Sequence, residues 1–477
     1  MSMNAPGFDK ALSLFHEMAE SVPAYSAFLK ENRINPSTII DETSFKQVPV
    51  INKENYLRRH SLQDLSWNGS LEKTSMISMS SGSSGDPFFW PHGEEQHLEG
   101  VQIHREILER IFETEHKRTL VVVSFSMGTW IAGPFTMLSA IGVSKYHSAL
   151  NVVTPGIDKE DAVRAILGLE SEYERIIICG YPPFAKDIYE NLISKGFNPP
   201  EGKVSFVFAG ESIDENWREF VLEEANISDM LHGSVNVYGS ADATILGHET
   251  PLSIAIRRAI SENDNRAIGS SLFGSNTLPS LVQYYPDMRY FEEVDGSLVF
   301  TSRSGIPLCR YEIGDQGKVF GFEKINTMLK ENFIDPDYGS IKQLEHWKGL
   351  PLVSINGRKN QTISLYGLLI YPENIKSALI QPELRNKLTG KFRMRVENDE
   401  ALKQVFTIDL ELKDGVAKDS IGIESIKHSI MSKLEMVNSE YRKLRNSVGE
   451  RAHPELNFFE YDHPDINNGK NKHRWNK

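Results

Sequence analysis

The sequence predicts an α/β protein with a large N-terminal unit and a smaller α+β unit after it. Its 477 residues exceed what one hydrophobic core usually holds, so two or three packed units are expected. Short apolar, β-branched runs alternate with helical stretches in the first part of the chain, which indicates a largely parallel sheet. The pattern changes after about residue 280 and again after Gly357. We therefore expect one domain over residues 1–356 and a mobile second domain over residues 357–477.

The first seventy residues read as helices, and a parallel sheet is expected after them. Helices are predicted over Asp158–Glu170 and Asp214–Glu224, and Ser212 with Glu215 has the spacing of a capping box that opens the second helix. Short runs rich in valine, isoleucine and phenylalanine suit strands that are buried on both faces. These runs are Thr119–Phe125, Arg175–Cys179, Lys203–Phe208 and Ser234–Tyr238.

After residue 280, strand-like runs close to turns predict a small β subdomain, and the last part of the chain predicts a compact α+β unit. Pro372 suits the first position of a helix that continues over Glu373–Ile380. One long amphipathic helix is expected over Ile423–Leu444. The predicted strands are Ser297–Ser302 and Gly317–Phe320 in the subdomain, and Phe392–Val396 paired with Phe406–Leu412 in the second unit.

Composition excludes several classes of protein. A net charge of -13 argues against a nucleic-acid partner, because phosphate backbones favour basic surfaces. Cys179 and Cys309 are too far apart in the sequence to suggest a disulfide framework or a thiolate zinc site. His92 and His97 are five residues apart, which does not place both on one helical face, so they are expected at the surface and not as zinc ligands. Without a secretory signal or a membrane-length apolar run, we expect a cytoplasmic protein.

A segment rich in glycine and serine is the first candidate for binding phosphate. Its glycines would let backbone amides approach a polyphosphate, and its hydroxyls would add hydrogen-bond donors. The alternative is a flexible connector. No Gly-Lys-Ser/Thr follows, so the segment is not a Walker loop. It consists of Ser80, Ser81, Gly82, Ser83, Ser84, Gly85, Asp86 and Pro87.

This segment and the four described next stand in the order found in the adenylate-forming superfamily, and within it the sequence resembles the phenylacetate–CoA ligase group. The family's phosphate loop has the form TSGSTGKP, which Ser80 to Pro87 matches. Asp86 stands where the family has lysine. A carboxylate beside a triphosphate is repulsive unless it faces away or meets a cation.

Two segments resemble the family's binding elements for adenine and phosphate. Ala209, Gly210 and Glu211 end a predicted strand and resemble the Gly-Ala-Glu segment whose backbone lines adenine; alone, they would read as an ordinary turn. The run from Tyr238 through Gly239, Ser240 and Ala241 to Asp242 resembles Tyr-Gly-x-Ser/Thr-Glu. The resemblance implies an aromatic ring against the base, a hydroxyl near phosphate, and an acid, here Asp242, that holds Mg²⁺.

Two further segments resemble the family's ribose site and hinge. Arg310-Tyr311-Glu312-Ile313-Gly314-Asp315 is similar to Arg-Tyr-x-Thr-Gly-Asp, and a carboxylate can accept hydrogen bonds from both ribose hydroxyls. The resemblance implies that Asp315 binds ribose, that Arg358 meets ribose or phosphate, that Asn360 replaces the usual hinge aspartate, and that Gly367 borders a thiol tunnel. Each segment alone would read as a surface turn.

The C-terminal tail and a run after the first buried strand complete the resemblance. The family ends with a Gly-Lys segment whose lysine stabilises the charge of adenylation, and Lys470 fits its position, with Lys472 as a competitor and a solvated basic tail as the alternative. With Ser83 of the loop, Lys470 is the predicted catalytic residue. Phe125, Met127 and Trp130 lie where the family builds its acyl pocket, although such a stripe is more often part of the core.

The resemblance implies an enzyme that uses ATP and Mg²⁺ to convert a carboxylic acid into its acyl-adenylate and then transfers the acyl group to coenzyme A, in an assembly that could be a homodimer. Two alternatives stay open at this point. The acyl group could pass to an amine, a protein or a carrier, or the chain could be a non-catalytic nucleotide sensor, since Asp86, Asp242 and Asn360 depart from the family pattern. The identity of the acid is not readable from the sequence.

Overall fold

The protein divides into two compact units. The first consists of Met1–Met79, Phe89–Gly180 and Ala185–Lys359, and the second of Ser80–Phe88, Tyr181–Phe184 and Asn360–Lys477. The computed structural model describes residues 5–80, 87–147, 149–262, 266–274, 278–358, 363–379, 381–385, 387–399, 401–418, 421–461, 463 and 466. The predicted domain boundary at residue 356 falls within a strand, Leu352–Arg358, and stays a prediction.

Within its described residues, the first unit contains a sheet of 11 strands in the order β10-β11-β12-β13-β9-β8-β7-β6-β5-β3-β4. A separate two-stranded sheet pairs β1 (Thr74–Ser80) with β2 (Phe88–Gly93). The strands of the large sheet are β3 (Thr119–Ser124), β4 (Leu150–Val153), β5 (Arg175–Gly180), β6 (Val204–Ala209), β7 (Ser234–Ser240), β8 (Thr244–His248), β9 (Ser280–Gln283), β10 (Arg289–Val294), β11 (Ser297–Ser302), β12 (Leu308–Phe320) and β13 (Leu352–Arg358).

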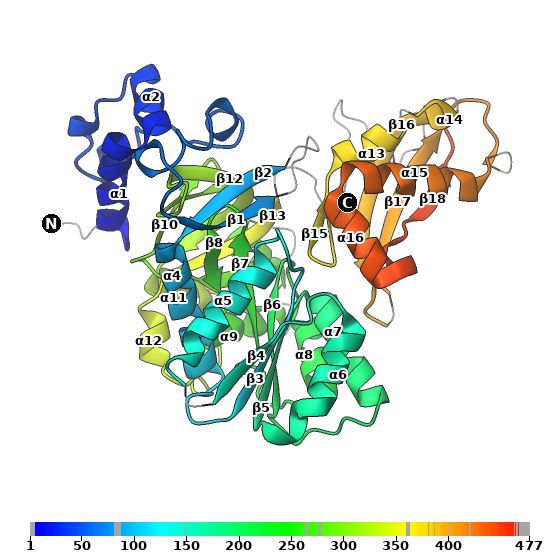
Figure 1. The fold of residues 1–477 in the computed structure, drawn as a ribbon, viewed down its shortest axis with the longest axis horizontal. Coiled ribbons are helices and arrows are strands. Elements are labelled where there is room, and N and C mark those ends of the chain that lie inside the picture. The colour runs from blue at the N-terminus through cyan, green and yellow to red at the C-terminus, as the bar shows by residue number, and fades with distance from the viewer. Residues whose placement is uncertain are drawn as a thin grey trace. The chain divides into compact units, whose positions relative to one another are not determined.

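The strands from β3 to β7 form the parallel part of the sheet. Their runs of valine, isoleucine and phenylalanine are buried on both faces, as the sequence predicted. The chain moves outward from β3 to β4 and returns past β3 to β5, so right-handed crossovers place the connecting helices of these two steps on opposite faces. The next two crossovers continue in the second direction, and Figure 1 shows α6, α7 and α8 together beside this part of the sheet.

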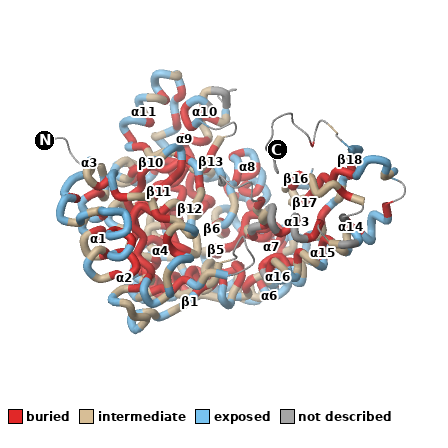
Figure 2. Tube along the Cα trace, turned by 90° about the horizontal axis from the view of Figure 1, so that it is seen from above, coloured by how far each residue is buried: buried red, intermediate tan, exposed pale blue. Residues whose placement is uncertain are grey.

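The strands from β7 through β13 to β10 are antiparallel. The predicted small β subdomain is therefore continuous with the main sheet, because β13 pairs with both β12 and β9. Buried residues concentrate along β10, β11 and β12, and exposed residues lie on α1, α3 and α11 (Figure 2).

Helices surround the sheet. In α8, Asp214 is the N-cap and accepts a hydrogen bond from the Trp217 amide at 2.8 Å. The predicted capping box of Ser212 and Glu215 is wrong because the helix begins two residues later than that pattern requires. The helical segments of the first unit are α1 (Phe8–Ser21), α2 (Pro23–Glu31), η1 (Pro36–Thr38), α3 (Glu42–Phe45), η2 (Leu57–Arg59), η3 (Trp67–Gly69), α4 (Glu94–Arg105), η4 (Glu106–Ile111), α5 (Ala132–Ser144), α6 (Lys159–Leu169), η5 (Glu170–Glu172), α7 (Pro182–Ser194), α8 (Glu215–Glu224), α9 (Pro251–Ser261), α10 (Arg266–Phe273), α11 (Phe322–Glu331) and α12 (Leu344–Lys348).

The second unit is built on a three-stranded sheet with mixed pairing. As predicted, two of its strands pair in antiparallel fashion, and the last strand joins in parallel. The single helix predicted over Ile423–Leu444 is wrong: Asn438 has an extended backbone and its side chain caps the second of two helices, so the helix breaks there. The elements are β14 (Ile363–Leu365), β15 (Leu368–Ile370), α13 (Pro372–Leu379), α14 (Pro382–Arg385), β16 (Leu388–Asn398), β17 (Gln404–Leu412), α15 (Ile423–Val437), α16 (Ser439–Val448), η7 (Gly449–Ala452) and β18 (Glu455–Phe459).

The α/β fold class predicted from the sequence is confirmed, with a large sheet-based unit and a small α+β unit. Among the described residues, no helix combines the length and the apolar character needed to cross a membrane.

Candidate active site

Three groups of predicted site residues follow strands that end at the same edge of the sheet. Phe125 follows β3, Gly210 follows β6, and Tyr238 lies near the carboxyl end of β7. Because β3, β6 and β7 all belong to the parallel part of the sheet, their carboxyl ends lie at one edge. In open α/β sheets, this edge is where ligands bind.

Two tyrosine–aspartate hydrogen bonds connect β7 to β12. The segments Tyr238–Asp242 and Tyr311–Asp315 each have a tyrosine four residues before an aspartate, and they exchange partners. The Tyr238 hydroxyl donates to Asp315 Oδ2 at 2.6 Å, and the Tyr311 hydroxyl donates to Asp242 Oδ2 at 2.6 Å. Both aspartates are only 4% exposed. The fold thus joins two predicted motifs that are about 70 residues apart.

Asp315 and Arg358 are the second predicted pair that the fold brings together. They are direct partners in the antiparallel register of β12 and β13. Gly314, immediately before Asp315, has a φ of +96°, a conformation that glycine adopts without a steric cost. The sequence placed Asp315 after a glycine turn, and the sheet register adds Arg358 beside it.

Asn236 is a candidate site residue that the sequence interpretation missed. It lies two residues before Tyr238 on β7 and therefore on the same face of the strand. Its side-chain amide donates to the Glu211 carbonyl at 2.8 Å, which holds the loop after β6 against β7. In the described residues its Oδ1 is buried without a hydrogen-bond partner. A buried, unpaired acceptor costs free energy unless a ligand supplies a donor.

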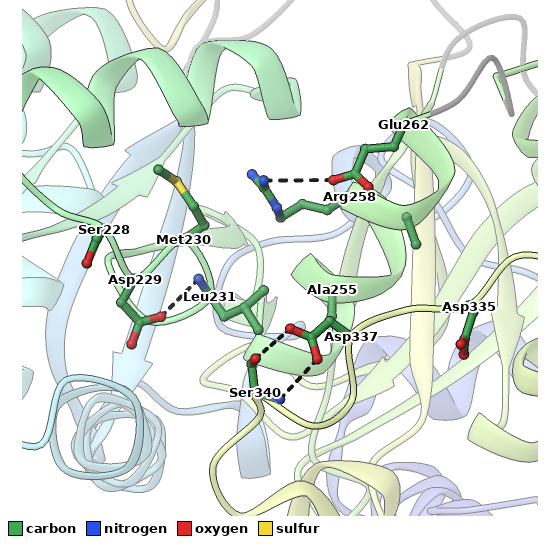
Figure 3. Close-up of a pocket in the computed structure, with 11 residues that line it drawn as sticks. Ser228, Asp229, Met230, Leu231, Ala255, Arg258, Glu262, Asp335, Asp337 and Ser340 are labelled. Atoms are coloured by element: carbon green, nitrogen blue, oxygen red, sulfur yellow. Dashed lines mark hydrogen bonds and ion pairs between the residues drawn. The ribbon is translucent and has the colours of Figure 1, made fainter.

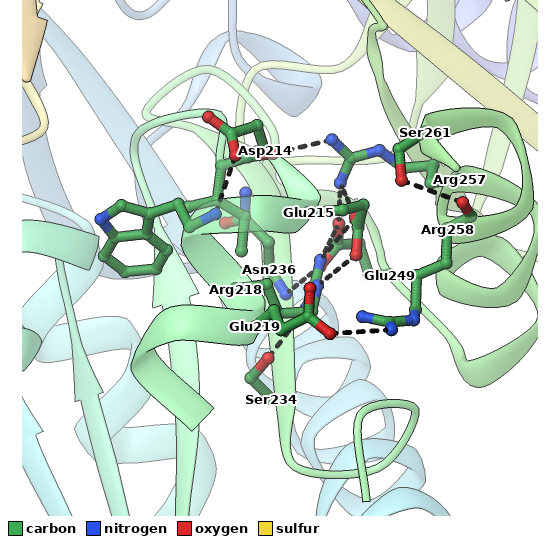
Figure 4. Close-up of polar contacts among 12 residues, drawn as sticks. Asp214, Glu215, Arg218, Glu219, Ser234, Asn236, Glu249, Arg257, Arg258 and Ser261 are labelled. Carbon is green, nitrogen blue, oxygen red and sulfur yellow. Dashed lines mark hydrogen bonds and ion pairs between the residues drawn. The ribbon is translucent and has the colours of Figure 1, made fainter. Parts of the chain in front are cut away.

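A buried ion-pair network supports this part of the site (Figure 4). Arg218 pairs with Glu249 at 2.7 Å and with Glu215 at 2.9 Å, and Arg257 pairs with Glu215 at 2.7 Å and Glu249 at 2.9 Å. Burial opposes ionisation of Glu215, but the two guanidinium groups outweigh it and hold the pKa of this carboxyl below its ordinary value. The four side chains carry two charges of each sign, so the network is balanced.

The same network contacts β7 and the loop after β6, which carry the predicted adenine site. Glu249 accepts a hydrogen bond at 2.9 Å from the backbone amide of Asn236, two residues before Tyr238 on β7. Arg257 donates to the Ile213 carbonyl at 2.7 Å, shortly after Gly210. The positions of β7 and of the loop after β6 therefore depend on charged groups in the core.

Asp242 and Ser240 mark the other side of the site. Asp242 Oδ1 lies 3.7 Å from the Lys53 ammonium, a residue that the sequence interpretation did not select. Ser240 Oγ accepts a hydrogen bond from the Ala243 amide at 3.3 Å and so stabilises the turn after β7. Among the described residues, no group of three or more His, Cys, Asp or Glu side chains could hold a metal ion. The assignment of Mg²⁺ to Asp242 stays a prediction, and a single carboxylate would need phosphate oxygens and water as the other ligands of the ion.

His92 lies near this side and is buried, so the prediction of a surface position for it is wrong. It lies on β2 and is 2% exposed, because the strand and not a helix determines which way it points. Its Nε2 is 2.7 Å from Ser78 Oγ on β1. Burial lowers the pKa of His92 to about 4, and its interactions with Gln96 and Asp242 offset this only in part.

The predicted acyl-pocket residues differ in burial. Phe125 and Trp130 are almost fully buried, whereas Met127 is half-buried and packs close to Gly133 and Gly156. The assignment of these three residues to an acyl pocket stays a prediction.

Several predicted residues fall outside this geometry. Ser81, Gly82, Ser83, Ser84, Gly85, Asn360, Lys470 and Lys472 lie outside the described residues. Ser80 ends β1, and Gly367 lies in the second unit with a φ of +78°. Of Arg358, only the backbone position is described.

The fold can be compared with solved structures. 2-Hydroxyisobutyryl-CoA ligase, crystallised with 2-HIB-AMP and CoA in the thioesterification state, matches with a TM-score of 0.67 and 16% identity over 100% of this chain and 90% of that chain. The same ligase in the postadenylation state with 2-HIB-AMP matches with a TM-score of 0.54 and 15% identity, over 96% and 87% of the two chains. This chain shares the fold of 2-hydroxyisobutyryl-CoA ligase. No protein-family profile matches the sequence, and no curated protein does.

A cavity of about 650 Å³ lies elsewhere in the first unit (Figure 3). Ser228 to Leu231 line it and precede β7, whereas Tyr238 lies near the other end of that strand. None of its lining residues is a predicted site residue. Two of its acidic side chains already accept hydrogen bonds from nearby residues. Asp229 accepts one from the Leu231 amide, and Asp337 accepts one from the Ser340 amide. We assign no ligand to this cavity.

Proposed function

We propose that this protein activates a carboxylic acid with ATP and transfers the acyl group to coenzyme A, as an AMP-forming acid–CoA ligase of the phenylacetate–CoA ligase type. The observation that carries the proposal is the exchange of hydrogen bonds between Tyr238–Asp242 and Tyr311–Asp315 at the ligand-binding edge of the sheet. Two motifs that resemble the ribose and phosphate segments of adenylate-forming enzymes converge there. The shared fold with a CoA ligase supports the same activity.

In this proposal, the side of the site around Tyr238 binds the nucleoside. The Tyr238 ring packs against adenine, and the unpaired Asn236 Oδ1 accepts a hydrogen bond from the adenine amino group. Asp315 accepts hydrogen bonds from the ribose hydroxyls, since a carboxylate has acceptor capacity beyond its bond to Tyr238. Arg358, its neighbour in the sheet, adds positive charge at the ribose or the phosphates. The backbone of Ala209, Gly210 and Glu211 lines the base.

The other side of the site holds the phosphates. The Ser80–Gly85 loop and Ser240 supply hydrogen-bond donors, and Asp242 holds Mg²⁺, which screens the charge of the triphosphate when it is bound. A carboxylate oxygen of the substrate attacks the α-phosphorus, pyrophosphate leaves, and the acid becomes a mixed anhydride with AMP, in which the acyl group no longer carries the carboxylate charge. The sulfur of coenzyme A then attacks the carbonyl carbon, and AMP leaves with the electrons of the broken C–O bond. Positioning and charge stabilisation account for the catalysis.

The second unit contributes by analogy with the family that the sequence resembles. Lys470 stabilises the transition state of adenylation, Asn360 acts as the hinge, and Gly367 borders the path of the thiol. A homodimer is also proposed from the resemblance.

The decisive experiment is a pyrophosphate-release screen over a panel of aromatic, fatty and hydroxylated acids, each with and without coenzyme A. We expect acid-dependent pyrophosphate release, and mass spectrometry should find an acyl-CoA only when coenzyme A is present. An amide or a protein-bound acyl group in its place would identify an amine or carrier as the acceptor. ATP binding without release for any acid would instead favour a nucleotide sensor.

The tail lysines provide a separate test. Lys470→Ala should slow adenylation by on the order of 10²–10³ and leave thioester formation from supplied acyl-AMP nearly unchanged, since the lysine stabilises only the first transition state. Lys472→Ala is the matched control. If Lys472→Ala gives this phenotype and Lys470→Ala does not, the catalytic lysine has been misassigned.

A further inference from the structure

Lys53 is held in a turn whose shape is fixed by two asparagines. Asn52 Oδ1 accepts hydrogen bonds from the amides of Glu54 at 2.9 Å and Asn55 at 2.8 Å. Asn55 Oδ1 accepts from the Asn52 amide at 2.7 Å, and Asn55 Nδ2 donates to the Val50 carbonyl at 2.9 Å. Asparagine side chains stabilise turns in this way. These hydrogen bonds therefore fix the backbone of the turn that carries Lys53.

The turn is fastened to β12 beside Tyr311. The Ile51 amide donates to the Arg310 carbonyl at 3.0 Å, and the Glu312 amide donates to the Ile51 carbonyl at 2.9 Å, so Ile51 forms a parallel bridge with Tyr311. The Arg310 guanidinium also donates to the Lys46 carbonyl at 2.7 Å. An N-terminal segment thus reaches the site through the strand that carries Tyr311 and Asp315.

The Lys53 ammonium lies at the phosphate side of the candidate site. Its Nζ is 3.7 Å from Asp242 Oδ1 and 5.7 Å from the centre of the Trp90 ring. Tyr311 occupies the other oxygen of Asp242 at 2.6 Å. The Lys53 side chain is 34% exposed, whereas Asp242 is 4% exposed, so the ammonium remains accessible to a ligand. A distance of 3.7 Å is long for a hydrogen bond, and the ammonium keeps donor capacity for other acceptors.

The charge of Asp242 is unfavourable for a polyphosphate without such a cation, because Asp242 is a buried carboxylate at the predicted phosphate segment. A polyphosphate needs cations to offset this charge, and lysine binds phosphate as a compact point charge.

We propose that Lys53 binds the polyphosphate of ATP and supplies, from an N-terminal turn, positive charge that offsets the Asp242 carboxylate. This inference rests on the proposed function. The inference predicts that Lys53 affects the binding of both ATP and Mg²⁺, because its ammonium faces the Asp242 oxygen that would hold Mg²⁺. Removing the ammonium should weaken binding of the phosphates and, by removing a like charge, strengthen binding of the metal ion. If Lys53 served only to stabilise the fold, its removal would weaken the binding of both the phosphates and the metal ion.

The test is binding of ATP and of Mg²⁺ by calorimetry, with the full-length protein and the variants Lys53→Met and Lys53→Arg. In EDTA, Lys53→Met should bind ATP about 10-fold more weakly than wild type, which corresponds to about one charge-assisted hydrogen bond. Lys53→Arg should stay within about threefold, since arginine keeps the charge. In a magnesium titration at saturating ATP, the midpoint for Lys53→Met should shift to a lower Mg²⁺ concentration.

Lys348 provides a matched control. Its ammonium is 5.6 Å from the centre of the Phe322 ring and 2.8 Å from Glu345, and its side chain is 30% exposed, so it resembles Lys53 in exposure and partners but lies in α12. Lys348→Met should bind ATP like wild type. The inference about Lys53 is wrong if, in EDTA, Lys53→Met binds ATP as well as wild type does. It is also wrong if Lys348→Met loses as much ATP affinity as Lys53→Met. In either case the proposed function stands, provided that wild type binds ATP. A wild type that binds no ATP in either buffer would overturn the proposed function as well.

Discussion

The two tyrosine–aspartate pairs of the candidate site have the same hydrogen-bond length and different surroundings. In each, a hydroxyl donates at 2.6 Å to an aspartate that is 4% exposed. Tyr238 is half-buried at the end of β7, and Asp315 lies beside Arg358 in the sheet. Tyr311 is fully buried, and Asp242 faces the ammonium of Lys53. The first pair thus combines a half-buried tyrosine with an aspartate whose strand partner is an arginine, and the second combines a buried tyrosine with an aspartate near an ammonium group.

Under the proposed function, the two pairs belong to a nucleoside side and a phosphate side of one sheet edge. The nucleoside side depends on a balanced ion network in the core, through Glu249 and the Asn236 amide. The phosphate side depends on a surface turn that is fastened to β12. We therefore expect substitutions on the two sides to affect stability and binding in different proportions.

The largest effect is expected from the ion network. Glu249→Gln should lower the free energy of unfolding by about 3–5 kcal/mol, because it leaves two buried guanidinium groups, Arg218 and Arg257, with the single carboxylate of Glu215 to balance them. Urea denaturation measures this change. Glu262→Gln is the control, since Glu262 is 59% exposed and 3.9 Å from Arg258, and it should cost less than about 1 kcal/mol. Equal losses in the two variants would mean that the network does not support β7.

The two aspartates should differ in nucleotide binding. Asp315→Asn should weaken ATP binding in EDTA by on the order of 10², because hydrogen bonds to a charged group contribute about 1.5–3 kcal/mol each. Asp242→Asn should bind ATP at least as well as wild type in EDTA, since it removes a negative charge near the phosphates, and should lose this advantage in Mg²⁺. Calorimetry in both buffers separates the two residues, and the same loss for both variants would remove the division between a nucleoside side and a phosphate side.

The phosphate side should also be sensitive to acid. The pKa of His92 is about 4 in the folded protein against an ordinary value of 6.5, so between these values the unfolded chain binds more protons. The contribution of neutral His92 to the free energy of unfolding is fully present above about pH 6.5 and is lost as the pH falls toward 4. At pH 5 the loss amounts to about 2 kcal/mol. His92→Gln should reduce the difference in unfolding free energy between pH 7 and pH 5 by about this amount. An unchanged difference would show that His92 titrates normally.

The smallest effect comes from the hydroxyls of the two pairs. Tyr311→Phe leaves a buried carboxylate oxygen without its donor and should cost about 1–3 kcal/mol, whereas Tyr238→Phe should cost about 1 kcal/mol because Tyr238 is half-buried. Thermal and urea unfolding compare the variants directly. A larger loss for Tyr238→Phe would reverse the assignment of the structural and ligand-facing pairs.

Local patterns in the sequence determined the fold class and most of the strands. Runs such as Thr119–Phe125 and Ser234–Tyr238 are apolar and β-branched, and a strand buried on both faces suits such residues in any tertiary context. The predictions failed where two local patterns compete. Ser212 with Glu215 offered one helix start and Asp214 another, and Asn438 interrupted an amphipathic pattern that looked continuous.

For the candidate site, the resemblance to adenylate-forming enzymes predicted residues within each motif, such as Tyr238, Asp242 and Asp315, because each motif is a short continuous segment of sequence. Only the tertiary structure decided that Tyr238 binds Asp315 while Tyr311 binds Asp242, since those contacts join strands that are separated by about 70 residues. Lys53 and the buried acceptor of Asn236 belong to the same class of fact. No periodicity or spacing records them, because charges and hydrogen bonds act through distances in space, which the path of the folded chain alone determines.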